Sequence, residues 1–223
     1  MKLYMHPVSM TSRPIRLFIA ESGIQVDEQV VDLMTGEHLQ PAFAAVNPSK
    51  MVPVLEDGDL RLTESSAILK YLADKINSPA YPKDLKQRAK VNEAMDWFNT
   101  NFYRDFGYGL CYPQLFPHHK RPTDAVQAAT VEWAKDRAQG WLKILNDSLL
   151  ADKPYLCGDS ISIADYLGVC LLTLGEITRC DWNKYPNVNR WVNTMKQLKS
   201  WNKVNEVLYG YAGSVKGQQF VTV

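Results

Sequence analysis

Residues 46–68 constrain the fold more than any other part of the sequence. A short apolar segment enters through the Val52-Pro53 bond, reaches an Asp57-Gly58 turn signal, and is followed by a second apolar segment at residues 60–62. The polar run at residues 63–66 then opens a segment with helical periodicity. This order predicts a β-hairpin whose second strand leads directly into a capped helix.

The residues before this hairpin predict a small mixed sheet. Residues 2–5 are typical of a strand, and a helix is expected from Ser12 to the stop signal at Ser22-Gly23. Residues 26–33 alternate as a second strand, and a short helix is expected around residues 41–46. With a right-handed crossover between the first two strands, this order predicts a mixed sheet with helices on its faces.

The chain changes character at residues 77–84, which contain two prolines and no hydrophobic period. No strand pattern follows. Two long helices are expected, separated by the aromatic and proline-rich residues 108–122. The apolar stripe of the second helix is predicted to consist of Val126, Ala129, Trp133, Trp141, Leu145 and Leu149.

Two further helices are expected nearer the C-terminal end. Ser162 is followed three residues later by Asp165, an Asp variant of the capping box, and the apolar run after it predicts a buried helix. A last amphipathic helix is expected behind Pro186, and an irregular tail from Tyr209.

The composition narrows the classes of function and compartment. A net charge of +1 argues against a nucleic-acid or membrane-surface binder, because both need a concentrated basic face. No leader pattern or apolar run of membrane-spanning length is present. The four cysteines lack the spacing of a metal site and are expected to be reduced thiols. A cytoplasmic protein with a small-molecule ligand and no bound metal is therefore expected.

Three motifs resemble the cytosolic glutathione transferases. They are Asn47-Pro48-x-Lys50-x-Val52-Pro53-x-Leu55, Leu62-Thr63-Glu64-Ser65-x-Ala67-Ile68-x-x-Tyr71-Leu72, and Ser162-Ile163-Ala164-Asp165. Ser9 and the segment Val31-Asp32-Leu33-x-x-Gly36-x-His38-Leu39 are most similar to the theta-like, serine-dependent branch. The resemblance implies a thioredoxin-like N-terminal domain with a mixed four-stranded sheet at residues 1–78, a linker at 79–87, and an all-helical domain at 88–223.

The resemblance also implies a binding site for the tripeptide glutathione. The Val52-Pro53 bond is expected to be cis, with the Val52 backbone pairing with the cysteinyl part of the ligand. Glu64 and Ser65 would hold the γ-glutamyl end at a helix N-terminus, where anions are favoured. At the glycine carboxylate the family often has a second lysine, but this chain has Met51, so Lys50, His38 or Gln40 would take that role.

A hydroxyl donor to the thiol is the catalytic group that the resemblance implies. Ser9 is the expected donor, and Ser12, Thr11 and Tyr4 remain alternatives. Tyr4 is expected to point to the opposite face of its strand from Met5, since side chains alternate along a strand. The family pattern Ser-x-Pro-x-Arg has Thr11 in place of its proline here, which leaves the register between Ser9 and Ser12 open.

The second substrate is expected to bind against an aromatic part of the helical half. Tyr103, Tyr108 and Tyr112 lie outside the stripe that Phe98, Phe102 and Phe106 make, and are expected to line an apolar cleft. Arg104 is expected to face the same cleft and to stabilise developing negative charge.

The sequence thus predicts a glutathione transferase that conjugates the thiol to apolar electrophiles, with glutathione as co-substrate and no cofactor. Alternatives are a dehalogenase, etherase or isomerase that uses the same thiol site, or a non-catalytic binding protein with this fold. The resemblance also implies a homodimer packed through residues 64–74 of one subunit and 88–105 of the other.

Overall fold

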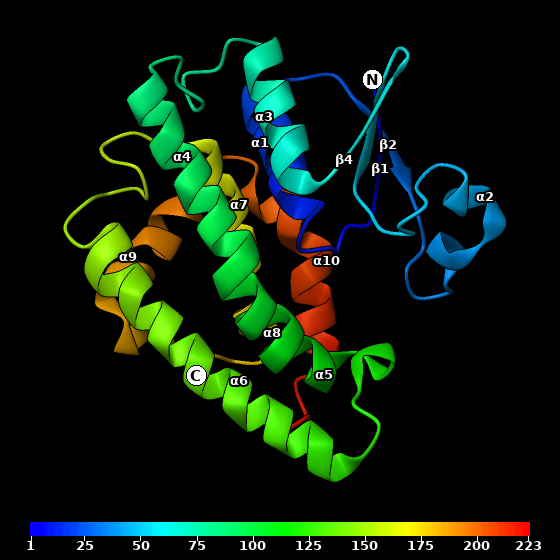
Figure 1. Ribbon diagram of the computed structural model, residues 1–223, viewed down its shortest axis with the longest axis vertical. Coiled ribbons are helices and arrows are strands. Elements are labelled where there is room, and N and C mark those ends of the chain that lie inside the picture. Colours follow the sequence, from blue (N-terminus) through cyan, green and yellow to red (C-terminus); the bar gives the residue numbers. More distant parts are fainter.

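The computed structural model describes residues 1–223 and divides into a sheet-containing half and a helical half (Figure 1). The first half contains β1 (Lys2–Met5), α1 (Arg13–Ser22), β2 (Asp27–Val30), α2 (Pro41–Ala44), β3 (Val54–Asp57), β4 (Leu60–Thr63) and α3 (Ser65–Lys75). A 3₁₀ turn, Glu37–Leu39, precedes α2.

The sheet is mixed and four-stranded, as predicted. Its strand order is β2-β1-β3-β4, with β1 parallel to β2 and the other neighbours antiparallel. Leu3 and Leu55 are cross-strand partners buried in the core that α1 and α3 share. On the other face, Tyr4 and Val54 pack with Phe43 of α2. Tyr4 therefore points away from the face of Met5, as predicted from strand alternation.

The second half is helical throughout, as predicted. It contains α4 (Leu85–Trp97), α5 (Tyr112–Leu115), α6 (Asp124–Ile144), α7 (Ile163–Leu172), α8 (Leu174–Ile177), α9 (Pro186–Met195) and α10 (Trp201–Ser214). Three segments are π-helical, namely Phe98–Phe102, Arg104–Cys111 and Leu145–Leu150, and two 3₁₀ turns lie at Pro117–His119 and Trp182–Lys184. No helix combines the length and apolar character that a membrane span requires. Helix α4 begins inside the predicted linker, and the exact domain boundaries stay a prediction.

The capping box at Ser162 is confirmed, and the helix after it is buried as expected. The backbone N–H and the hydroxyl of Ser162 both donate to Asp165 Oδ2, each at 2.8 Å. All ten residues of α7 are buried, so the helix forms the centre of the helical half.

Two expectations for the helical half are wrong. The predicted stripe of α6 places Val126 and Trp133 inside, but these side chains are 48% and 57% exposed. The buried face of α6 instead consists of Val131, Ala134, Ala138 and Leu142. The C-terminal end also differs from the expectation: α10 follows the helix behind Pro186, which was expected to be the last, and the tail from Tyr209 is helical as far as Ser214. Leu208 on α10 is buried, and α10 packs against α1 and α8.

Arg13 fastens the two halves together at the start of α1. Its guanidinium is fully buried and donates to Asn205 Oδ1 at 2.7 Å, Thr173 Oγ1 at 2.9 Å and the Cys170 carbonyl at 3.2 Å. These acceptors belong to α7, the residue after it, and α10. The loop that carries Ser9 is therefore anchored to the helical half as well as to the sheet.

Candidate active site

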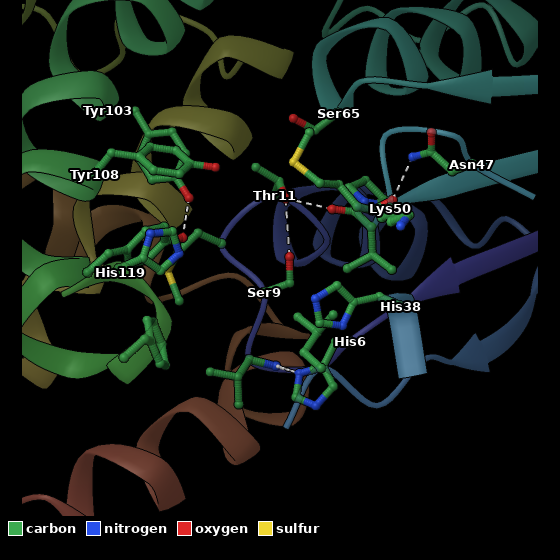
Figure 2. Close-up of a pocket in the computed structure, with 18 of the residues that line it drawn as sticks. His6, Ser9, Thr11, His38, Asn47, Lys50, Ser65, Tyr103, Tyr108 and His119 are labelled. Atoms are coloured by element: carbon green, nitrogen blue, oxygen red, sulfur yellow. Dashed lines mark hydrogen bonds between the residues drawn. The ribbon is translucent and has the colours of Figure 1, made fainter. Parts of the chain in front are cut away.

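A cavity of about 520 Å³ lies between the two halves and is lined by both (Figure 2). The sheet half contributes the loop after β1, the segment before β3 and the start of α3. The helical half contributes the tyrosines of residues 103–112, Phe116 and the 3₁₀ turn after α5.

The cavity brings together eleven of the residues predicted for the site. They are Ser9, His38, Lys50, Met51, Val52, Pro53, Glu64, Ser65, Tyr103, Tyr108 and Tyr112. Four other candidates, Tyr4, Ser12, Gln40 and Arg104, do not line it, whereas the alternative donor Thr11 does.

Ser9 lies in a short hydrogen-bonded loop at the floor of the cavity. Its Oγ accepts from the Ser12 backbone N–H at 3.2 Å and lies 3.1 Å from Thr11 Oγ1. Thr11 in turn donates to the Val52 carbonyl at 3.1 Å. Ser12, by contrast, has no exposed surface, and its Oγ has no hydrogen-bond partner. Of the two serine candidates, only Ser9 reaches the cavity.

The segment before β3 is shaped by Asn47. Its Nδ2 donates to the Met51 carbonyl at 2.7 Å and its Oδ1 accepts from the Ser49 N–H at 3.0 Å. Lys50 adopts a left-handed conformation with φ of 55°, and the Val52-Pro53 peptide bond is cis, as predicted. The loop presents the side chains of Lys50 and Met51 and the backbone of Val52 to one cavity.

Glu64 and Ser65 stand at the N-terminus of α3. Glu64 has φ of 66° and ψ of 117°, a conformation that costs a non-glycine residue about 1–3 kcal/mol. Its carboxylate forms no ion pair in the chain, and the Ser65 hydroxyl forms no hydrogen bond. The first N–H groups of α3 also point out of the helix end. This corner therefore offers a carboxylate for a cation and a helix N-terminus for an anion.

All four histidines of the chain line the cavity: His6, His38, His118 and His119. Burial lowers the pKa of His38, and the neighbouring His118 lowers it further; its Nδ1 is buried without a partner. Burial also lowers the pKa of His6 and of His119.

An aromatic wall closes the side of the helical half. Tyr108 packs edge-on against Tyr103 and Tyr112, with ring centroids 5.2 Å and 5.0 Å apart. The hydroxyls of Tyr103 and Tyr112 are hydrogen-bonded to each other, and burial raises the pKa of both, so they remain neutral. Tyr108 is 41% exposed and its hydroxyl has no partner in the chain.

The expectation that Arg104 faces the cavity is wrong. Its Nε donates to Oδ1 of the buried Asp105 at 2.8 Å, and Arg137 and Trp141 donate to the same carboxylate. Hydrogen bonding from i to i+5 brings Tyr103 and Tyr108, five residues apart, to one face of the helix. Arg104 is held away from the cavity by its ion pair with the buried Asp105.

Several cavity residues carried no clear signal in the sequence. Val8, Met10 and Asn99 all line it. Asn99 also donates to Ser66 Oγ at 2.6 Å, which ties the π-helical segment to the start of α3. An apolar loop residue and a helical asparagine are ordinary in any protein, so only the three-dimensional structure identifies these positions.

Comparison with known proteins agrees with this geometry. The family model for the glutathione S-transferase N-terminal domain matches residues 1–74, and the model for the C-terminal domain matches residues 113–199. Human glutathione S-transferase theta-1 is 37% identical over 171 residues, which cover 76% of this chain and 70% of that protein.

Solved structures show the same relationship. The apo form of human glutathione S-transferase T1-1 aligns with a TM-score of 0.82 and 30% identity, over 95% of this chain and 90% of that one. Human glutathione transferase theta-2, in complex with glutathione and an unknown ligand, aligns with a TM-score of 0.84 and 26% identity, over 100% of this chain and 93% of that one. The protein belongs to the glutathione S-transferase family.

Proposed function

We propose that this glutathione S-transferase activates the thiol of glutathione through Ser9 and conjugates it to apolar electrophiles. The observation that carries the proposal is the position of Ser9, whose hydroxyl lines the cavity while that of Ser12 is buried outside it. Tyr4, another alternative, lies on the opposite face of the sheet, where its hydroxyl donates to Glu56 at 3.2 Å.

The task of Ser9 is to favour the thiolate over the thiol. A free thiol has a pKa near 8.5, and each unit of depression requires about 1.4 kcal/mol of preferential stabilisation of the anion. A hydrogen bond to a charged group contributes about 1.5–3 kcal/mol, so one donor lowers the pKa by about one to two units. The Ser12 N–H, already bonded to Ser9 Oγ, polarises the hydroxyl and strengthens this donor.

The rest of the sheet half would bind the tripeptide. The backbone of Val52 would form strand-like hydrogen bonds with the cysteinyl part of glutathione. Pro53 has no N–H of its own to satisfy at this edge of the sheet. Glu64 would pair with the γ-glutamyl ammonium, and Ser65 and the N-terminus of α3 would take the neighbouring carboxylate.

The glycine carboxylate would lie near Lys50 and His38. Both line the cavity, and neither side chain forms an ion pair within the chain. Met51, half exposed beside them, adds no charge, so this end of the ligand depends on Lys50 and His38.

The aromatic wall would bind the electrophile. Tyr103, Tyr108 and Tyr112 offer apolar ring surface, and Phe116 extends it. Since Arg104 points away from the cavity, the only free polar group on the tyrosine rings is the Tyr108 hydroxyl. A small hydrophobic second substrate suits this wall.

Three further features follow from the same proposal. Glutathione acts as a co-substrate, with no separate cofactor. The active protein is a homodimer packed through α3 of one subunit and the start of the helical half of the other, and it works in the cytoplasm.

The proposal is tested by Ser9→Ala and Ser12→Ala, with conjugation of chlorodinitrobenzene followed against pH. Ser9→Ala should raise the pH midpoint of kcat/KM by about one to two units and lower the rate near neutral pH about 10- to 100-fold. Ser12→Ala should leave the midpoint unchanged. Retention on immobilised glutathione shows that each variant still folds and binds. An unchanged midpoint in Ser9→Ala would show that Ser9 is not the donor.

A further inference from the structure

Thr11 makes two hydrogen bonds that the proline of the family pattern could not make. Its Oγ1 lies 3.1 Å from Ser9 Oγ and donates to the Val52 carbonyl at 3.1 Å (Figure 2). Thr11 and Ser9 both line the cavity. Thr11 therefore links the proposed thiol donor to the backbone that would bind the ligand.

The number of hydroxyl protons fixes which group donates in each of these hydrogen bonds. A hydroxyl has one proton, and a carbonyl oxygen can only accept. The Thr11 proton is given to the Val52 carbonyl, so in the Ser9–Thr11 contact Ser9 must be the donor. One of the two lone pairs of Ser9 Oγ already accepts the Ser12 N–H. In this arrangement Ser9 has no proton left for a sulfur atom.

A bound peptide ligand would supply another hydrogen-bond donor to the Val52 carbonyl. Strand-like pairing brings a ligand N–H to that oxygen, in the role that the Thr11 hydroxyl has without ligand. The Thr11 proton can then turn to Ser9 Oγ, which accepts it together with the Ser12 N–H. Ser9 is left with its own proton free, pointing into the cavity.

We propose that Thr11 is a positioning residue whose hydroxyl transfers its hydrogen bond from the Val52 carbonyl to Ser9 when the tripeptide backbone binds, and so directs the Ser9 hydroxyl to the thiol. No covalent bond changes; each hydroxyl keeps its proton and exchanges one acceptor for another. The inference rests on the proposed role of Ser9. It makes recognition of the ligand backbone a condition for thiol activation, because hydrogen bonds in a chain strengthen one another.

The test is the pKa of the bound thiol in Thr11→Val, measured from the ultraviolet absorbance of the thiolate and from the pH profile of kcat/KM. The substitution keeps the shape of the side chain and removes the hydroxyl. We expect the pKa to rise by roughly half to one unit, which lowers the rate below the midpoint about three- to tenfold. The alkaline plateau should not change, and Thr11→Ser should restore the wild-type midpoint.

The direction of the pKa change in Thr11→Val shows whether Thr11 donates to Ser9 or to the Val52 carbonyl in the bound state. If Thr11 kept its bond to Val52 after ligand binding, it would compete for the Ser9 proton, and removing it would lower the pKa. A lowered or unchanged pKa therefore overturns the proposal. Thr11→Ala serves as a second variant for the same measurement. Thr194→Val is the matched control, since Thr194 lies on the exposed face of α9, away from the cavity, and donates to the Arg190 carbonyl.

A double-mutant cycle separates this proposal from the role of Ser9 itself. In a Ser9→Ala background, Thr11→Val should add no further shift, because Thr11 acts only through Ser9. An equal shift in both backgrounds would mean that Thr11 donates directly to the sulfur, which overturns the proposal. If Ser9→Ala alone leaves the pKa unchanged, the role of Ser9 fails and the Thr11 inference fails with it. If Ser9→Ala raises the pKa and Thr11→Val does not, only the Thr11 inference is refuted.

Discussion

Replacing Asp165 by alanine should destabilise the protein more than any surface change. Four donors share this buried carboxylate. The Leu156 N–H and the Trp191 indole N–H reach Oδ1, each at 2.9 Å, and the Ser162 N–H and hydroxyl reach Oδ2, each at 2.8 Å. Asp165 has no exposed surface, so water cannot replace the carboxylate without entering the core.

The expected loss follows from these four donors. Each buried donor left without a partner costs about 1–3 kcal/mol, although the Ser162 hydroxyl can turn to another acceptor. Part of the loss is offset, because burial penalises the charged carboxylate and raises the pKa of Asp165. Breaking a buried charged network by removing one partner typically costs about 3–5 kcal/mol. We expect that range for Asp165→Ala, a large part of the about 5–15 kcal/mol that holds an ordinary domain folded.

The assay is urea unfolding followed by tryptophan fluorescence at one fixed protein concentration. Asp84→Ala is the matched control: Asp84 is the exposed N-cap of α4, and its carboxylate accepts only the Gln87 N–H, at 2.9 Å. Its loss should cost about 0.5–2 kcal/mol. Equal destabilisation by the two substitutions would refute the reasoning, because it would mean that the buried donors find other partners.

Three further predictions concern pH, packing and affinity. Burial lowers the pKa of His6 from 6.5, so below pH 6.5 the unfolded chain binds a proton at His6 more readily than the folded chain does. The free energy of unfolding should therefore fall as the pH drops below 6.5. In urea unfolding measured against pH, His6→Asn should reduce this fall. Leu142→Ala should cost about 2–5 kcal/mol in urea unfolding and Trp133→Ala less than about 1 kcal/mol, because only Leu142 is buried. Met51→Lys should tighten glutathione binding about 1.5- to fivefold by calorimetry, and added salt should remove the gain.

The sequence predicted what depends on local patterns. The hairpin, the start of α3 and the buried α7 each follow from a few adjacent residues, and Val52, Pro53, Glu64 and Ser65 lie within or beside the first two. The predicted side-chain cap of α3 is absent, because no side chain accepts a hydrogen bond from its first N–H groups. Ser9 and Ser12 could not be separated in this way, since both are small hydroxyl residues in one loop. Their burial depends on how α1 packs against the helical half.

The buried face of α6 was predicted wrongly because the hydrophobic pattern was traced through large apolar residues such as Trp133. Ala134 is buried there because the helix approaches Gly109 closely: a Cβ added at Gly109 would lie 2.7 Å from the Ala134 Cβ. Small residues thus allow the close contact between α6 and the segment that carries Gly109. Trp133 lies outside this contact, with its ring centroid 5.7 Å from the Arg137 guanidinium. The α10 helix was missed for a related reason, since Gly210 and Gly213 favour loops by propensity while burial of Leu208 on the core favours helix.

If the aromatic wall binds the second substrate as proposed, the π-helical segments Phe98–Phe102 and Arg104–Cys111 would make chain length, as well as composition, a determinant of which substrates fit. Tyr112, Phe116 and His119 follow the widened turns and line the cavity, so the length of these turns helps to set where the three rings lie. Losing one residue between Phe98 and Cys111 would turn everything beyond it by about 100° and move this wall away from the thiol. Among relatives, a one-residue gap here should therefore change substrate range more than most single replacements.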